Sequence, residues 1–335
     1  MERSVPKPLM TSTCMRVGRV PPEKLTRRLT PVDHVFELSS MGIPAVCSHS
    51  WTLDITGLVD RSMAMSFEEL LRFPKRTVES AFVCSGDPRR PTTPLRRVAN
   101  VKWGGVDLAE LLSRVGVRRE ATHLWSYGQD HGEFFGVPQH HYVKDMPLAR
   151  LTEGSVLIAY ELNDAPLTPR NGFPVRLVIP RFYGTNCVKW LCRLDLRERR
   201  ASDFITTSLY SDPDFDVDPS GRTTKPVWAV APESIIVSLR PESRIGRKPT
   251  EIWGWAWSNC PVQSVDISTD GSESWSEASL ESPRGLSWQR FSYMWLPSRA
   301  GRFNVCCRAT DTNGRTQPVV AARNAVHSIP INVGA

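Results

Sequence analysis

A cysteine ends an apolar run in the stretch FVCSGDPRR, residues 82–90. Gly86, two positions on, lets the backbone approach a bulky ligand closely, because glycine has no Cβ. Arg89 and Arg90 would lower the pKa of a nearby thiol, and the thiolate is the form that ligates a metal or attacks a substrate. From this chemistry alone, Cys84 is a buried thiol, a metal ligand, or a nucleophilic or redox thiol. A nucleophile needs a base, for which the sequence offers His123, His131, His140 and His141.

A second group of chemically capable residues lies between positions 159 and 191. Four cations stand there around turns rich in glycine and proline: Arg170, Arg176, Arg181 and Lys189. Cations on loops and strand ends suit a phosphate or pyrophosphate, with backbone N–H groups helping. The competing interpretation is a solvated charged face.

Short strands and two helices are predicted to position these residues in the first half of the chain. Ser66 and Glu69 form a capping-box pattern, which predicts a short helix over 66–73. Apolar residues at helical spacing predict another helix over 106–117. Strands are predicted at 51–60, 77–84, 155–163, 173–180 and 187–196. The fold class expected for this half is therefore α+β.

The second half has a different pattern. Residues 210–227 are rich in Asp, Pro, Gly and Ser without periodicity, which predicts a linker. Beyond it, runs of strand residues are separated by turn signals, at the spacing of an immunoglobulin-like β-sandwich. Trp253, Trp255 and Trp257 alternate along one run and so share a face, which favours a place in the core.

Composition excludes several classes of protein. The 335 residues are enough for about two domains. The net charge of +7 comes from scattered residues rather than a basic block, so nucleic-acid binding is not expected. The eight cysteines include no Cys-x-x-Cys pair, so zinc is not expected, and most should be buried free thiols. We see no membrane-length apolar run and no signal peptide or twin-arginine signal, and expect a cytoplasmic protein with no membrane span.

Several motifs in a fixed order resemble the sulfite-oxidase family of molybdenum enzymes. The first half contributes Cys84-Ser-Gly-Asp-Pro-Arg-Arg90, Ala159-Tyr-Glu-Leu-Asn-Asp-Ala-Pro-Leu167, Gly172-Phe-Pro-Val-Arg176 and Val188-Lys-Trp-Leu191. The second half contributes Gly254-Trp-Ala-Trp-Ser258, Val265-Asp-Ile-Ser268 and Arg308-Ala-Thr-Asp311. The resemblance covers about residues 29–333. It implies an N-terminal arm at 1–28, a mixed α/β molybdopterin-binding domain at 29–210, a linker at 211–227 and a dimerisation domain at 228–335.

The resemblance also implies a cofactor and a set of site residues. It makes Cys84 the protein ligand of molybdenum, beside two sulfurs from molybdopterin. Tyr210, Arg89 and Arg290 are expected to face the substrate. Ser39, Ser40, Asp130, Asn171, Arg176 and Lys189 are expected to bind the cofactor, with Arg176 and Lys189 at its phosphate. No haem is expected in this chain.

The chain departs from the family pattern at three places. Leu38-Ser39-Ser40 replaces an Arg-Asn-His triplet whose arginine helps to bind the substrate anion, and the loss of that charge predicts weak sulfite turnover. Asp87-Pro88 stands where one Asn is usual, which adds a residue and a carboxylate near the metal. Asn171 replaces a His that contacts the pterin, and Asn can still form hydrogen bonds.

The resemblance therefore implies two-electron oxygen-atom transfer on a small oxyanion or sulfur substrate. One alternative is a reductase of S-oxides, N-oxides or oxyanions on the same scaffold. Another is a non-catalytic dimeric binding protein that keeps the fold. The expected partners are a small anionic substrate, an external electron acceptor or donor such as a cytochrome or oxygen, and a second copy of the chain.

Overall fold

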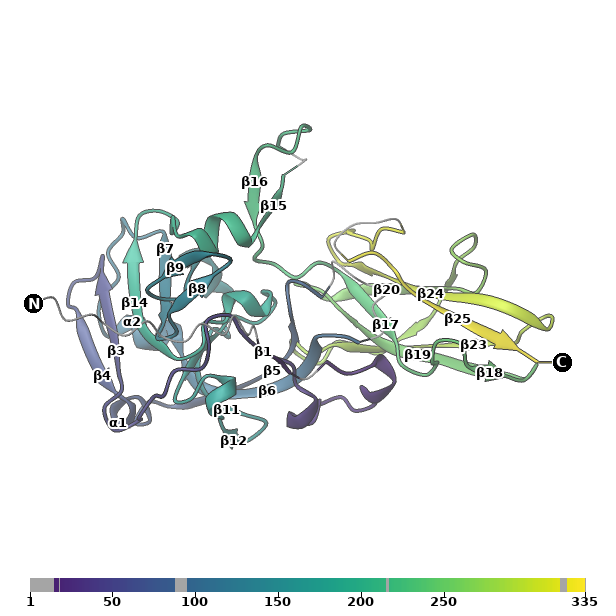
Figure 1. The fold of residues 1–335 in the computed structure, drawn as a ribbon, viewed down its shortest axis with the longest axis horizontal. Helices are drawn as coiled ribbons and strands as arrows, with labels where there is room; N and C mark the ends of the chain where they lie inside the picture. Colours follow the sequence, from purple (N-terminus) through teal and green to yellow (C-terminus); the bar gives the residue numbers. More distant parts are fainter. Residues whose placement is uncertain (1–14, 18, 88–94, 215–216, 320–323, 335) are drawn as a thin grey trace, which may run out of the picture.

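The computed structural model describes residues 15–17, 19–87, 95–214, 217–319 and 324–334. Two β-rich halves follow one another end to end along the long axis of the molecule (Figure 1). Within these ranges the α-helices are short, namely α1 (Phe67–Leu70) and α2 (Leu108–Ser113). The first half is thus mostly sheet, and the expectation of a mixed α/β domain overstated its helix content.

Two larger sheets form most of the first half, and two short pairs, β1 (Met15–Val17) with β2 and β8 with β9, lie outside them. One of the larger sheets has the strand order β10-β7-β14-β3-β4 and the other β12-β11-β6-β5, with β13 paired to β11. The strands are β2 (Glu37–Ser39), β3 (Thr52–Gly57), β4 (Met63–Ser66), β5 (Lys75–Val83), β6 (Val98–Asp107), β7 (His123–Gly128), β8 (Gly132–Phe134), β9 (Val137–Gln139), β10 (Val143–Pro147), β11 (Leu157–Leu162), β12 (Ala165–Pro166), β13 (Arg176–Val178) and β14 (Leu191–Arg197). Their apolar faces share one large core, which α2 also joins.

Local sequence signals explain the helices of this half. Ser66 accepts a hydrogen bond from the Glu69 backbone, and the Glu69 carboxylate accepts one from the Ser66 backbone, so the predicted capping box is present. The amphipathic segment forms only α2, because its first residues belong to β6 instead. Short 3-10 turns fill several loops, including η4 (Pro169–Asn171) and η5 (Gly184–Asn186).

The second half consists of two sheets around a separate core. Their strand orders are β17-β19-β23-β22 and β18-β25-β24-β20-β21. The strands are β17 (Glu233–Ile236), β18 (Arg244–Ile245), β19 (Thr250–Trp257), β20 (Val262–Ser268), β21 (Ser276–Glu277), β22 (Ser279–Leu280), β23 (Gln289–Trp295), β24 (Gly301–Asp311) and β25 (His327–Val333). The all-strand prediction is confirmed, while β25 and the short edge strands were not predicted.

The two halves also share a hydrophobic cluster. It joins Val83 and Val98 of the first half to Trp255, Trp257 and other residues of the second. The indole N–H of Trp255 donates to the backbone carbonyl of Leu25 at 2.6 Å. The core position predicted for these tryptophans is therefore confirmed for Trp255 and Trp257, and the core that they join lies between the halves.

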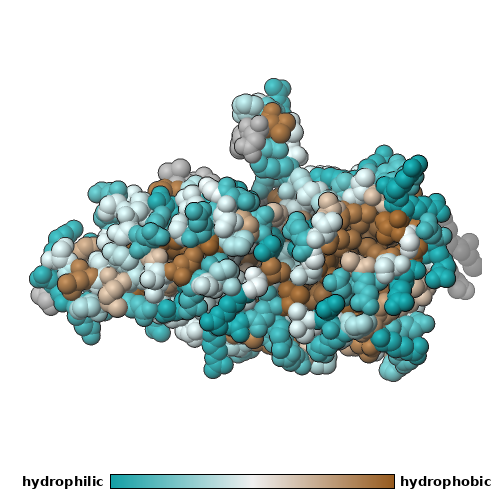
Figure 2. All heavy atoms as spheres, turned by 180° about the vertical axis from the view of Figure 1, so that it is seen from behind, coloured by the Kyte–Doolittle hydropathy of each residue, from teal (hydrophilic) through white to brown (hydrophobic). Residues whose placement is uncertain are grey.

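The predicted linker forms a β-hairpin. Strands β15 (Ser211–Pro213) and β16 (Thr224–Pro226) pair antiparallel, and the hairpin projects beyond the body of the protein in both views (Figures 1 and 2). Tyr210 at its base accepts a backbone hydrogen bond from Val227 at 3.0 Å. In the part of the chain that the structure describes, no helix combines the length and the apolar character needed to cross a membrane.

Candidate functional site

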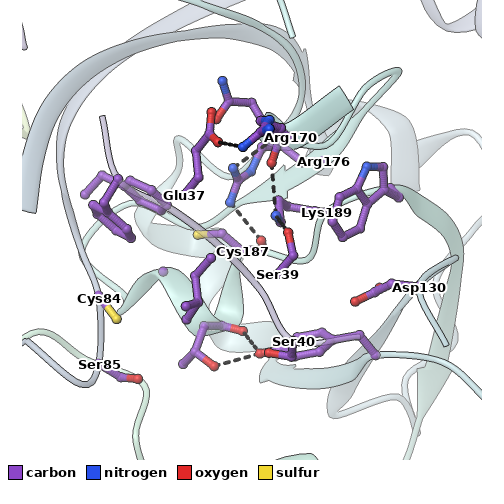
Figure 3. A pocket seen from close by; sticks show the side chains of 18 of the residues that line it. Glu37, Ser39, Ser40, Cys84, Ser85, Asp130, Arg170, Arg176, Cys187 and Lys189 are labelled. Carbon is purple, nitrogen blue, oxygen red and sulfur yellow. Dashed lines mark hydrogen bonds and ion pairs between the residues drawn. The ribbon is translucent and has the colours of Figure 1, made fainter. Parts of the chain in front are cut away.

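A pocket in the first half collects residues from segments that lie far apart in the sequence (Figure 3). It lies where β2, the end of β5, the turns η4 and η5 and the segment before β14 meet. The predicted residues Ser39, Ser40, Cys84, Asp130, Asn171, Arg176, Lys189 and Tyr210 all line it. Its other lining residues include Glu37, Leu38, Tyr142, Arg170, Thr185 and Cys187.

Cys84 follows β5 directly and lies in a tight turn. Its N–H donates to the carbonyl of Arg97 at 3.0 Å, and its carbonyl accepts from the N–H of Asp87 at 3.0 Å. Burial raises the pKa of the Cys84 thiol, and the Arg97 guanidinium acts in the opposite direction. The sequence pattern suggested a lowered pKa from Arg89 and Arg90, but both lie outside the described residues.

Arg176 at the start of β13 is buried, with its guanidinium facing the rings of Phe82 and Trp103. Two of its nitrogens donate to backbone carbonyls, that of Asn171 at 3.1 Å and that of Cys187 at 2.9 Å. Its Nε has no hydrogen-bond partner. Burial lowers the pKa of Arg176 to about 10, so the side chain is a buried cation at neutral pH.

Lys189 and Asp130 complete the polar wall. The Lys189 ammonium donates to Ser39 Oγ at 2.9 Å and to the Arg170 carbonyl at 3.0 Å. Burial and the neighbouring Arg176 lower the pKa of Lys189 to about 7. Burial raises the pKa of Asp130 to about 7, against the attraction of Lys189. Figure 3 shows Arg170, Arg176 and Lys189 together, and Cys84 on a separate segment of the wall.

The backbone before β14 explains how Lys189 reaches the pocket. A strand was predicted over 187–196, but β14 begins only at Leu191, and Trp190 has a positive φ of 49°. The Trp190 indole donates to the Pro169 carbonyl at 2.8 Å, which ties this irregular segment to η4. The same segment that breaks the strand therefore presents Lys189 to the pocket.

Tyr210 lines the pocket at the end of the π-helical turn η6 (Ile205–Leu209). Tyr142 lies near it and donates from its hydroxyl to the Thr185 carbonyl at 2.9 Å. The Lys144 ammonium lies 5.0 Å from the centre of the Tyr210 ring. Tyr142, Thr185 and Lys144 were not predicted, because they lie outside the motifs and carry no spacing signal of their own.

Two predicted residues are not among the described residues that line the pocket. Arg290 lies on β23, where it donates to Glu251 at 2.8 Å and stacks over Trp253, and it is not among the described residues that line the pocket. Arg89 lies outside the described residues. Their roles at the substrate stay predictions.

The Asp87 carboxylate was expected near the metal, but it is engaged elsewhere. It accepts from Arg96 Nε at 2.8 Å and from the Arg97 N–H at 2.6 Å. Asp87 is not among the described residues that line the pocket, although Cys84 is.

The residues of the pocket fit a group that combines a soft metal with a phosphate. Cys84 supplies a thiol, which suits a redox metal. Arg176 has a buried N–H without a partner, and Lys189 and the Ser39 hydroxyl lie beside it. Among the described residues, no three His, Cys, Asp or Glu side chains gather as a metal site of their own.

Comparison with protein families gives two matches. Residues 40–205 match the oxidoreductase molybdopterin binding domain, and residues 224–332 match the Mo-co oxidoreductase dimerisation domain. A solved structure, the sulfane dehydrogenase SoxCD from Paracoccus pantotrophus, superposes with a TM-score of 0.82 at 25% identity, and the match covers 100% of this chain and 90% of that one.

Individual relatives agree with these matches. Sulfite oxidase of Gallus gallus is 30% identical over 325 residues, which cover 89% of this chain and 70% of the relative. Mitochondrial sulfite oxidase of Mus musculus is 28% identical, and the match covers 93% of this chain but only 63% of the relative. A nitrate reductase of Phaseolus vulgaris is 26% identical over 87% of this chain and 37% of its own length. The chain thus spans less than two thirds of several relatives that it matches, and it belongs to the sulfite-oxidase family of molybdopterin-binding oxidoreductases.

Proposed function

We propose that this protein is a molybdenum-cofactor-dependent oxidoreductase that transfers an oxygen atom to or from a small oxyanion or sulfur substrate. The observation that carries the proposal is the placement of Cys84 in one pocket with two basic side chains, the buried Arg176 and the partly buried Lys189. A thiolate ligand and a phosphate-binding wall are the two things that a molybdenum–pterin cofactor requires of its protein.

The bound cofactor would supply two-electron redox chemistry at the metal, and the chain supplies everything around it. Cys84 ligates the metal. Arg176 and Lys189 bind the pterin phosphate, and Ser39, whose hydroxyl accepts from Lys189, orients that ammonium. Asn171 and Asp130 are buried hydrogen-bonding groups for the pterin. These groups are held by the fold before the cofactor arrives, which limits the cost of binding.

The substrate side of the pocket is less charged than the sulfite-oxidase pattern. Leu38 lines the pocket where the family pattern has an arginine, so a bidentate contact to a substrate oxyanion is missing at this position. Tyr210 lines the same pocket and offers a hydroxyl to the substrate. We therefore expect weak activity towards sulfite and better activity towards a less charged or larger sulfur compound.

We assign the remaining parts of the protein by the same family. The second half is an immunoglobulin-like dimerisation domain, and two copies of the chain form a homodimer. This is supported by the match to the dimerisation domain and by the two packed sheets. Electrons pass to or from a separate protein or small acceptor, a cytochrome being the first candidate.

The test is metal content and turnover of protein made in a host that produces molybdopterin. We expect close to one molybdenum and one pterin per chain. Cys84→Ser should lower turnover at least about 100-fold, beyond the 10–100-fold cost of losing an outer-shell partner of a metal. Cys187→Ser is the matched control, because Cys187 is also a buried thiol in the pocket wall. Molybdenum far below one per chain, unchanged by Cys84→Ser, contradicts the proposal.

A substrate panel then decides the direction. Sulfite and larger thiol or sulfane compounds are assayed with ferricyanide or cytochrome c as acceptor. Sulfoxides, nitrate and chlorate are assayed with reduced viologen as donor. Sulfite rates equal to those of authentic sulfite oxidases would refute the role given to Leu38. Metal-loaded protein without a redox response to any donor or acceptor would favour a binding protein.

A further inference from the structure

We propose that Arg96 is a positioning residue through which the second half of the chain holds the Cys84 loop in place. This proposal rests on the proposed function, because a fixed position of the Cys84 sulfur matters when that sulfur ligates a metal. The Cys84 loop is the turn from Cys84 to the unusual Asp87, and Arg96 and Arg97 lead into β6. Hydrogen bonds hold its backbone and the Asp87 side chain in place. The residue to which Arg96 connects them, Glu233, lies in the second half.

The backbone of the loop is closed on both sides of Cys84. The Cys84 N–H donates to the Arg97 carbonyl, and the Asp87 N–H donates to the Cys84 carbonyl, each at 3.0 Å. The Asp87 carboxylate then accepts from the Arg97 N–H at 2.6 Å. Asp87 therefore ties the turn that contains Cys84 to the strand that leaves the loop.

Arg96 carries this tie into the second half. Its guanidinium is 0% exposed, donates from Nε to Asp87 at 2.8 Å and forms an ion pair with Glu233 of β17. Glu233 is 1% exposed. All three side chains are buried, so removing the charge of Asp87 or Glu233 leaves the Arg96 guanidinium less well compensated in a place that water does not reach. The Asp87–Arg96–Glu233 chain therefore resists any movement of the loop away from β17.

The anchor is itself held firmly. Glu233 begins a strand that pairs with β19, whose tryptophans pack into the cluster between the halves. The strand leading into Cys84 is held to the second half as well, because the Ala81 N–H donates to the Leu286 carbonyl at 3.2 Å. The Trp288 N–H donates to Asn100 Oδ1 at 3.3 Å, on the strand after the loop. Both strands that flank the loop are thus attached to the second half.

This arrangement gives Asp87 a role. Its carboxylate is the group that joins the Cys84 turn to Arg96, whereas Pro88 and the arginines that follow lie outside the described residues. The competing interpretation is an ordinary buried salt bridge that stabilises the fold and has no specific effect on Cys84. The two differ in what happens to the sulfur when the distant anchor, Glu233, is changed.

The test measures alkylation of Cys84 by iodoacetamide in cofactor-free protein, with the rate at each cysteine read by peptide mass spectrometry. Glu233→Gln removes the anchor charge while keeping the shape, and Asp87→Asn does the same at the loop end. We expect each variant to raise the Cys84 rate about tenfold through easier local opening. Cys187, buried in the same pocket, should be unchanged. Asp266→Asn, which breaks a peripheral ion pair to Arg308 in the second half, should leave Cys84 unchanged.

A second readout uses the loaded enzyme. The electron paramagnetic resonance signal of singly reduced molybdenum should shift in Glu233→Gln and be restored in part by Glu233→Asp, which returns the charge at a shorter reach. A fall in melting temperature with unchanged alkylation and an unchanged signal would contradict the proposal. The contacts among Asp87, Arg96 and Glu233 would then only stabilise the fold. If wild-type protein binds no molybdenum, the proposed function fails. The alkylation rates still show whether Arg96 and Glu233 hold the Cys84 loop in place. If one of the two variants does not fold, the other decides.

Discussion

Asp130 and Asp311 are both buried aspartates, one in each half of the molecule, and their surroundings shift their pKa values in opposite directions. Asp130 borders the pocket, and burial raises its pKa to about 7. Asp311 ends β24 and is 0% exposed. Burial would raise its pKa too, but hydrogen bonds from Arg315 and Ser258 outweigh burial and hold the pKa below its ordinary value.

The same contrast extends to other polar groups. In the second half, Gln317 Oε1 accepts from Ser234 and from the Ala309 N–H, and its Nε2 donates to the Asn324 carbonyl. Around the pocket, Arg176 Nε and Lys144 Nζ are buried without a hydrogen-bond partner. The described residues of both halves bury some polar atoms without a partner, among them the indole N–H groups of Trp257 and Trp288 in the second half. The halves differ in how they treat a basic side chain: among the described residues the buried Arg176 guanidinium contacts only backbone carbonyls, whereas Arg308 of the second half is paired with Asp266.

The largest effect predicted from this comparison is at the pocket. Arg176→Gln should lower cofactor affinity about 100-fold, because it removes a buried charge-assisted donor for the phosphate. The free energy of unfolding of the cofactor-free protein should fall less, because removing a buried charge that has no ion-pair partner among the described residues offsets the loss of its hydrogen bonds to the Asn171 and Cys187 carbonyls. Pterin fluorescence and molybdenum content measure the first quantity, and urea denaturation measures the second.

The matched control is Arg308→Gln in the second half, where the arginine is paired with Asp266 at 2.9 Å. It should leave cofactor content unchanged. Loss of folding without loss of cofactor affinity in Arg176→Gln would reverse the comparison, since Arg176 would then serve the core rather than a ligand.

Local signals in the sequence predicted many of the elements, and family motifs grouped many of the residues that line the pocket. The capping box at Ser66 needs only four residues to form, so it could be seen from sequence. Ser39, Asp130 and Lys189 meet in the pocket from distant segments, and only their resemblance to family motifs grouped them. The amphipathic stretch at 106–117 was predicted to be one helix. Its first two residues, Val106 and Asp107, instead pair with β11 as part of β6. Pairing across the sheet outweighed helix propensity there.

Other features depended on contacts that no sequence pattern announces. The ion pair between Arg96 and Glu233 joins residues 137 positions apart, and Asp87 was expected at the metal because its partner Arg96 was not foreseen. Tyr142 and Thr185 carry no spacing signal, so they entered the site only through the fold. The hairpin at 211–227 was expected to be a linker because Asp and Pro dominate its sequence.

The second prediction tests the hydrogen-bonded carboxylate of the second half, Asp311. Asp311→Asn should lower the free energy of unfolding at pH 7 by about 2 kcal/mol, because a hydrogen-bonded ion pair with Arg315 is lost. The folded pKa is below the unfolded value, so the stability from ionisation is present above about pH 4. It is lost as the pH falls through the folded pKa. Urea denaturation at pH 7 and at pH 3 should show the difference from wild type shrinking at the lower pH. A difference independent of pH would mean that packing, not charge, holds Asp311.

The third and smallest effect is at Asp130, where substitution should raise the free energy of unfolding, whereas at Asp311 it should lower it. Here the folded pKa, about 7, is above the unfolded value, so the stability of the protonated form is present below pH 3.8 and is lost as the pH rises through 7. Asp130→Asn should therefore make the cofactor-free protein more stable than wild type at pH 8, by about 1–2 kcal/mol, because the neutral amide avoids the burial of a charge. The gain should grow between about pH 4 and 7 and level off above, as urea denaturation across this range would measure.

A loss of stability in Asp130→Asn at pH 8 would place Asp130 with Asp311, as a carboxylate already satisfied by its own fold. Lys189 is the group that could do this, because its attraction is what opposes burial at Asp130. Repeating the measurement in a Lys189→Met background separates the two contributions. With a pKa of about 7, Lys189 is only partly charged at pH 8, so its loss should enlarge the gain from Asp130→Asn only slightly. An unchanged gain would mean that Lys189 does not compensate the Asp130 carboxylate at this pH.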